Sequence, residues 1–198
     1  MILTEIIEIA KEFGTWIHEH TNEVAHSNNL RTTTGLGILQ QSQDICDAVT
    51  ILIDSNLPGP AHALARSMLD TYIRGLWLFN YASEEELNKF LKGECPDFKK
   101  LLIEIGNEAE TGGAWIHEIA ASNRKAFHDL MHGGAEHLLR RITANSIEPN
   151  YPEEELVRLM HIQIEIQIAI GVNLLASSNN LEALEILESM AKHYRALH

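Results

Sequence analysis

The residues best suited to chemistry lie in the segment Asn123–Arg141, where cationic side chains and histidines are concentrated. Arg124, His128 and His132 are spaced by four residues, so on a helix they lie along one face. A Gly-Gly pair at 133–134 then interrupts the helix where that face ends. Histidine titrates near neutral pH and arginine carries a fixed charge. This combination suits the handling of a phosphate group.

The chemistry that these residue types favour is RNA cleavage without a metal ion. Such a ribonuclease needs a group that accepts the 2′-hydroxyl proton and a cation that stabilises charge on the phosphate oxygens. We predict a catalytic set with His132 as the acid or base: His132, His128, Arg124 and Lys125. Arg124 or Lys125, together with Arg140 and Arg141, is predicted to hold the phosphate. The alternative is structural, since cations also stabilise the end of a helix by interacting with its dipole.

A metal site is a second interpretation of the same segment. His128 and His132 lie one helical turn apart, which is the spacing of two zinc ligands, but no clear third ligand follows. The doublet His128-Asp129 also resembles the metal-binding HD phosphohydrolases. That family needs a downstream aspartate, and no aspartate follows Asp129. We therefore predict neither a metal nor another cofactor.

A polar stripe with a spacing of four is formed by His62, Arg66, Asp70 and Arg74. Arg–Asp–Arg ladders of this kind commonly form surface or interhelical salt bridges that contribute little to stability. The functional interpretation is that Arg66 and Asp70 face the basic cluster across the bundle and orient it. We predict these two as substrate-binding residues.

Composition limits the classes of function. The chain has 198 residues, with 45% hydrophobic and 22% charged residues, which predicts one soluble domain over residues 1–198. Its net charge of −13 argues against extended nucleic-acid or anionic-membrane surfaces, but it allows a small basic site. The sequence contains no run of about 18 uncharged apolar residues, so no membrane-spanning helix is predicted. Cys46 and Cys95 match no metal or redox motif and are predicted to be free thiols, which favours a cytoplasmic protein.

The elements that must position these residues are helical. Leu3, Ile6, Ala10, Phe13 and Ile17 follow alternating steps of three and four residues, typical of one buried helical face. Proline, glycine, asparagine and capping signals divide the rest into further helices. We expect them at 34–55, 60–81, 83–91, about 96–105, about 122–133 (with the basic cluster), from 152, and after 180.

One segment, residues 161–172, is ambiguous between strand and helix. Its isoleucines alternate with other residues at 162, 164, 166, 168 and 170, which taken alone is typical of a strand. No other segment alternates comparably, so such a strand could pair only with another subunit. As a helix, the isoleucines form two stripes on roughly opposite faces. We predict a helix that is buried on two sides, either central in the bundle or at a dimer contact.

Several short motifs carry a resemblance to known proteins: Ala65–Asp70 followed by Leu76-Trp77-Leu78, Met131–Gly134, Arg140-Arg141 and Ile147–Tyr151. Together they resemble a group of uncharacterised bacterial helical proteins. That group is distantly similar to the HEPN superfamily, helical bundles that often dimerise and include metal-independent ribonucleases of toxin–antitoxin and antiphage systems. The HEPN motif is an arginine, four to six residues and a histidine. Here six residues separate Lys125 from His132, and seven separate Arg124 from it.

The sequence therefore predicts an all-α, up-and-down bundle of about six to eight helices in a single domain. The resemblance implies a homodimer and a ribonuclease of a bacterial defence or toxin–antitoxin system, with RNA or an antitoxin as partner. Charge and hydropathy predict no membrane association. The alternative is a non-enzymatic interaction protein in which the histidine cluster is structural.

Overall fold

The protein is an all-α bundle in its computed structural model, as the sequence predicted. The structure describes residues 1–22, 27–106, 115–116, 118–120 and 134–197. The labelled helices are α1 (Leu3–Thr21), α2 (Leu30–Asp54), α3 (Pro58–Asn80), α4 (Glu84–Phe90), α5 (Phe98–Gly106), α7 (Ala135–Leu139), α8 (Glu153–Ser177) and α9 (Leu181–Arg195). Within the described part of the chain, seven helices have at least seven residues, so the expected number of six to eight is confirmed.

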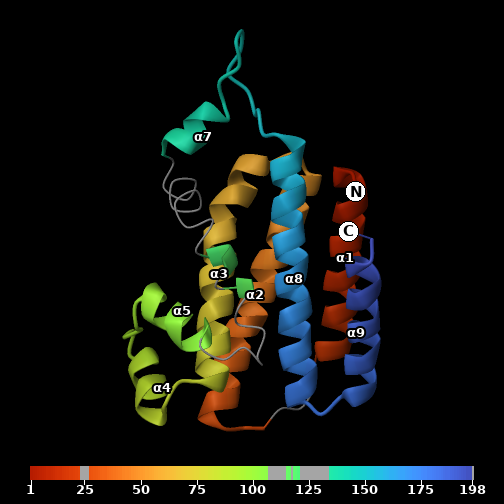
Figure 1. Ribbon diagram of the computed structural model, residues 1–198. Helices are drawn as coiled ribbons and strands as arrows, with labels where there is room; N and C mark the ends of the chain where they lie inside the picture. Colours follow the sequence, from red (N-terminus) through yellow and green to blue (C-terminus); the bar gives the residue numbers. More distant parts are fainter. Residues whose placement is uncertain (23–26, 107–114, 117, 121–133, 198) are drawn as a thin grey trace.

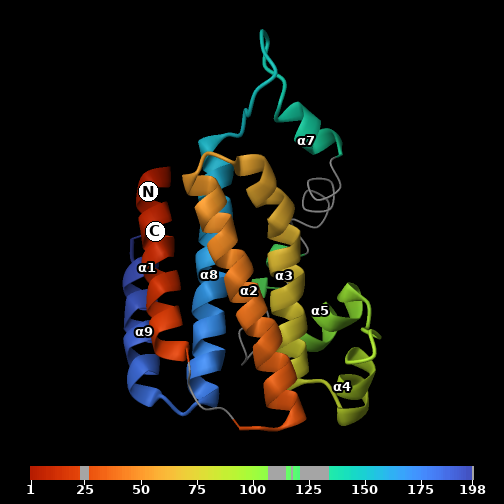
Figure 2. The ribbon, with the colours of Figure 1, turned by 180° about the vertical axis from the view of Figure 1, so that it is seen from behind.

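Five long helices, α1, α2, α3, α8 and α9, form the body of the bundle (Figure 1). Helices α3 and α8 begin at the same end of the bundle, and α7 with the loop after it projects beyond that end. Helices α4 and α5 pack beside the opposite half of α3, as the view from behind also shows (Figure 2). Segments far apart in the chain, around residues 58 and 152, therefore lie together at one end.

Helix α8 is the central helix, which settles the ambiguous segment in favour of the predicted helix. The five isoleucines from Ile162 to Ile170 are all buried, because α8 contacts α1, α2, α3 and α9. By length and composition alone α8 could cross a membrane, yet 61% of its most apolar window is buried inside the bundle. Its apolar character is therefore explained by packing on more than one face.

Local capping signals set the helix boundaries. The Asn29 side chain accepts a hydrogen bond from the backbone N–H of Thr32 at 2.9 Å, which fixes the start of α2 at Leu30. The prediction that this helix starts at residue 34 was therefore wrong by one turn. The capping box of Ser83 and Glu86 is present as predicted. Cys46 and Cys95 are free thiols, as expected.

A polar layer interrupts the apolar core between α1, α2 and α8. Asp47 Oδ1 accepts hydrogen bonds from Gln43 Nε2 at 3.2 Å and from Gln167 Nε2 at 2.9 Å. Asp47 Oδ2 lies 2.6 Å from His18 Nε2. Both glutamines are buried, and their side-chain carbonyl oxygens have no hydrogen-bond partner among the described residues. Because buried amides are costly without partners, this layer depends on the Asp47 carboxylate.

Helices α2 and α3 form the most extensive contact among the described helices, and a glycine allows their close approach. A Cβ at Gly35 would lie 2.6 Å from Phe79 Cβ and 2.7 Å from Phe79 Cα, so the α3 backbone would have to move. We expect Gly35→Ala to lower the free energy of unfolding by about 1–3 kcal/mol. The measurement is urea denaturation followed by circular dichroism.

Gly37 is the matched control for this substitution. It is exposed on the same helix, and a Cβ there would meet nothing within 4 Å. Gly37→Ala should therefore stabilise the protein by about 0.5–1 kcal/mol, because alanine has the higher helix propensity. Equal effects of the two substitutions would contradict the proposed close contact.

Candidate functional site

The predicted site residues divide into two groups in the structure. The four predicted catalytic residues lie outside the described residues: Arg124, Lys125, His128 and His132. The four predicted substrate-binding residues are described, and they lie in two different places: Arg66, Asp70, Arg140 and Arg141. The first pair is on α3, and the second pair follows α7 at the projecting end.

The Arg66–Asp70 pair forms a local contact on α3. Arg66 Nε lies 3.0 Å from Asp70 Oδ1, one helical turn away. The Arg66 guanidinium also lies over the ring of Phe98 on α5, 4.2 Å from its centroid. Burial raises the pKa of Asp70 above its ordinary value, and Arg66 opposes that shift. The described contacts of this pair thus join α3 to α5 and do not reach Arg140 or Arg141.

Among the described residues, a group of chemically capable side chains lies where α3 and α8 begin. We call it the end cluster, and it comprises His62, His137, Arg140, Arg141, Tyr151 and Glu155. Its centre is the hydrogen bond between His137 Nδ1 and the Tyr151 hydroxyl, 2.9 Å long. Gly59 lets both side chains approach the first turn of α3, because a Cβ there would lie 3.0 Å from Tyr151 Oη.

His62 is buried beside this contact. It is 5% exposed, and its ring stacks on Tyr151 with the centroids 5.2 Å apart. Its Nδ1 donates a hydrogen bond to the Pro58 carbonyl oxygen at 2.9 Å. Burial lowers the pKa of His62 below its ordinary value, so the ring is neutral at pH 7. The neutral His62 ring therefore packs against the Tyr151 ring and helps to hold it in place.

The arginines give the end cluster a positive balance. Arg140 and Glu155 form a two-point ion pair, with Nε–Oε2 and Nη2–Oε1 distances of 2.8 and 2.9 Å. The hydrogen bonds from Arg140 hold the pKa of Glu155 below its ordinary value. Arg141 and Arg158 are exposed nearby, and both act on the cluster through their charge. Arg140 and Arg158 thus act on Glu155, and Arg141 acts on Tyr151, in a protein with a net charge of −13.

Comparison with known proteins places the chain in a family. The model of a family of unknown function, DUF6988, matches residues 39–197. The chain belongs to this family. No curated protein and no solved structure matches it. The part of this DUF6988 protein that the family model matches contains the whole end cluster, whereas α1 precedes it.

The arrangement around His137 is suited to proton transfer. The Tyr151 hydroxyl can accept a hydrogen bond from Nδ1–H or donate one to an unprotonated Nδ1. Burial raises the pKa of Tyr151, so its hydroxyl keeps its proton near neutral pH. The His137 imidazole is therefore held in place whether its Nε2 carries a proton or not. A group that acts as both acid and base within one catalytic cycle requires this.

Sequence reasoning missed three members of this cluster in the DUF6988 protein: His137, Tyr151 and Glu155. The feature of the sequence that could have indicated them is a proline at the start of both α3 and α8, two helices that begin at the same end of the bundle. His62 was recognised only as part of the α3 stripe. Among the residues that the structure describes, no three His, Cys, Asp or Glu side chains are grouped to hold a metal ion.

Proposed function

We propose that this DUF6988 protein binds RNA at the end cluster and cleaves it without a metal ion. The observation that supports this most strongly is the histidine–tyrosine hydrogen bond between His137 and Tyr151, beside a group of arginines. An imidazole that is held at one nitrogen by a hydroxyl can transfer a proton, and a fixed positive charge beside it can stabilise a phosphate. Phosphodiester cleavage needs both. The acidic remainder of the chain limits RNA contact to this small region.

The proposed reaction uses two imidazoles for proton transfer and two arginines for the phosphate. One imidazole removes the 2′-hydroxyl proton, the 2′-oxygen attacks phosphorus, and a second imidazole gives a proton to the departing 5′-oxygen. His137 is one of these groups, and His132, five residues earlier in the chain, is the other. Arg141 binds the phosphate. Arg140, held by Glu155, adds positive charge from a fixed position. The products are a 2′,3′-cyclic phosphate and a 5′-hydroxyl.

The resemblance to HEPN proteins supplies the biological part of this proposal. On the strength of that resemblance we propose a ribonuclease of a bacterial toxin–antitoxin or defence system, with an antitoxin as the partner that restrains it. In that setting the protein acts in the cytoplasm, where RNA is its substrate.

The experiment is incubation of the purified full-length protein with total RNA in excess EDTA. Cleavage that persists in EDTA and leaves 2′,3′-cyclic phosphate ends is the expected result. Intact RNA, or cleavage that EDTA abolishes, contradicts the proposal.

A second candidate function, protein–protein interaction through a homodimer, is supported by the projecting arm, residues 135–150. Its apolar side chains are exposed: Leu138 by 59%, Leu139 by 63%, Ile142 by 48% and Ile147 by 86%. The arm is closed by backbone hydrogen bonds, from Glu148 N–H to Arg141 O at 2.9 Å and from Asn150 N–H to Arg140 O at 2.8 Å. A group of exposed apolar side chains on an ordered projection is typical of an interaction site.

We expect the protein to be a dimer in solution and Ile147→Ser to shift it toward the monomer, because the substitution removes the most exposed apolar side chain of the arm. The measurement is light scattering coupled to size exclusion over a range of concentrations. Ile51→Ser is the matched control, since Ile51 on α2 is 62% exposed but lies outside the arm. A monomeric wild type, or a dimer that Ile147→Ser leaves intact, would rule out this interface.

A further inference from the structure

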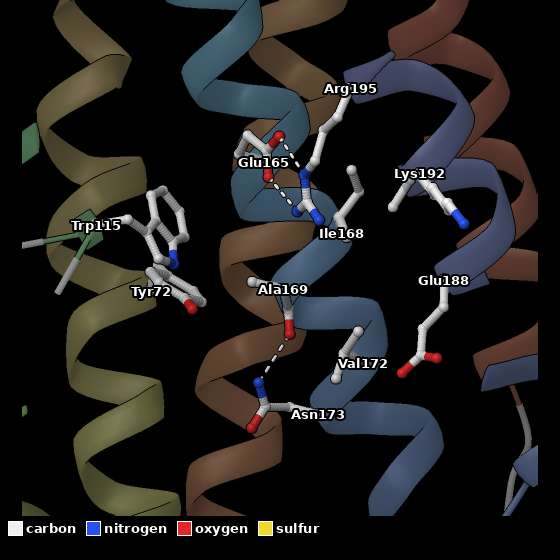
Figure 3. Close-up of a pocket in the computed structure, with 11 residues that line it drawn as sticks. Tyr72, Trp115, Glu165, Ile168, Ala169, Val172, Asn173, Glu188, Lys192 and Arg195 are labelled. Carbon is white, nitrogen blue, oxygen red and sulfur yellow. Dashed lines mark hydrogen bonds and ion pairs between the residues drawn. The ribbon is translucent and has the colours of Figure 1, made fainter. Parts of the chain in front are cut away.

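The polar stripe of α3 includes an arginine, Arg74, that lies away from the end cluster. Figure 3 shows the other side of this helix, where Tyr72 lies beside Trp115 at a cavity that α3 shares with α8 and α9. Arg74 follows Tyr72 by two residues, so it lies on nearly the opposite face of α3. Its charge acts on Asp70 of the same stripe and on Cys95, in the loop between α4 and α5. Arg74 therefore lies where α3 meets that loop.

Arg74 differs from the other partly buried arginines because it has no oxygen partner. Four arginines are partly buried within the described part of the chain. The other three each bind an oxygen: Arg31 that of the Ala82 carbonyl, Arg66 that of Asp70 and Arg140 that of Glu155. No hydrogen bond or ion pair joins Arg74 to a described residue, and its Nε is fully buried without a partner. A charged donor in such a position favours the binding of an acceptor.

The balance of charge on this face of α3 is positive. Arg66 and Arg74 both act on Asp70, and two arginines against one aspartate leave one positive charge. Glu94 and Asp97, beside Cys95 in the chain, are exposed and form no ion pair with Arg74. Burial raises the pKa of Cys95 above its ordinary value, so its thiol keeps its proton and can donate a hydrogen bond.

We propose that Arg74 and Cys95 bind a phosphate group where α3 meets the loop between α4 and α5. The terminal N–H groups of Arg74 bind two oxygens, and the Cys95 thiol donates to a third. A carboxylate fits less well, because its two oxygens would both be bound by Arg74 and the thiol would lack an acceptor. Both side chains are partly exposed, so the group can enter from solvent.

This phosphate site is separate from the proposed RNA site. Arg74 comes twelve residues after His62 on α3, which is about 18 Å along the helix. The two sites can therefore be tested independently.

The test uses the Cys95 thiol as a reporter. The chain has two cysteines and Cys46 is buried, so N-ethylmaleimide alkylates Cys95 first. We expect inorganic phosphate, added to the full-length protein at constant ionic strength, to slow this alkylation until the site is saturated. Arg74→Met removes the charge and keeps an unbranched side chain. It should raise the phosphate concentration for half-protection about tenfold or more, since charge-assisted hydrogen bonds are lost. No protection, or equal protection of both proteins, would overturn the proposal.

Two further variants separate this site from general charge effects and from the end cluster. Lys192→Met removes an exposed cation on α9, and Arg141→Ala removes one from the end cluster. Phosphate should protect Cys95 in both variants as it does in the wild type. Without phosphate, Arg74→Met should melt no lower than the wild type, because the charge that it removes has no partner. A lower melting temperature would show that Arg74 serves the fold and would overturn the proposal.

The choice of anion tests the assignment to phosphate. Acetate should give no protection, and equal protection by acetate would contradict a phosphate site. Adenosine monophosphate distinguishes two sources of the group. Protection at a lower concentration than inorganic phosphate assigns the site to a nucleotide, and protection by inorganic phosphate alone assigns it to the free ion.

Discussion

Asp47→Ala is expected to lower the free energy of unfolding by about 3 kcal/mol, because it leaves two buried amide groups without an acceptor. The N–H groups of Gln43 and Gln167 both donate to Asp47 Oδ1, and the two side chains are 2% and 0% exposed. Neither can turn to water without opening the contact between α2 and α8. Urea denaturation monitored by circular dichroism measures the loss.

Asp54→Ala is the control for removing an aspartate from α2. Asp54 contacts only Lys11 among the described ion pairs, at 3.0 Å and at the surface, so its removal should leave the unfolding midpoint nearly unchanged. If Asp47→Ala were as well tolerated as Asp54→Ala, the polar layer would not hold the helices as described.

His137→Gln is expected to reduce the rate of RNA cleavage in EDTA by about a hundredfold or more, the usual contribution of an acid or base. Glutamine keeps a hydrogen-bonding group near Tyr151 but cannot transfer a proton. The melting temperature should therefore change little, and the measurement pairs initial cleavage rates with thermal denaturation. His132→Ala should cause a loss of the same order, since the two act on one reaction.

His193→Gln controls for the loss of any histidine. His193 is exposed on α9, far along the chain from the end cluster. The His193→Gln variant should therefore cleave RNA at the wild-type rate. A His137→Gln variant that melts early and yet retains its activity would show that His137 is structural, which is the interaction-protein alternative.

The fold could be predicted because its signals are local. The alternating three- and four-residue steps of α1, the capping box at Ser83 and the prolines at 58 and 60 each mark helices from neighbouring residues alone. The isoleucines of α8 were harder, since a period of two also fits a strand. Burial on more than one face explains the pattern, and it depends on how many helices surround α8.

The end cluster could be predicted only in part, because its contacts join helix ends that are distant in sequence. Arg140 and Arg141 were recognised by their charge, but the partner of Arg140 is Glu155, on a helix that begins beyond the arm. Tyr151 meets His62 across nearly ninety residues of chain. Pairing of this kind follows from how the helices pack and leaves no fixed spacing in the sequence.

The most direct test of the central claim is the binding of a single-stranded DNA oligonucleotide. It carries hydrogen in place of the 2′-hydroxyl, so that it cannot be cleaved. Fluorescence anisotropy should show salt-dependent binding to the wild type, and Arg141→Ala should weaken it about tenfold by removing a phosphate contact. Lys92→Ala, which removes an exposed cation outside the end cluster, should bind as the wild type does. No binding, or equal binding by Arg141→Ala and the wild type, would contradict a phosphate site at the end cluster.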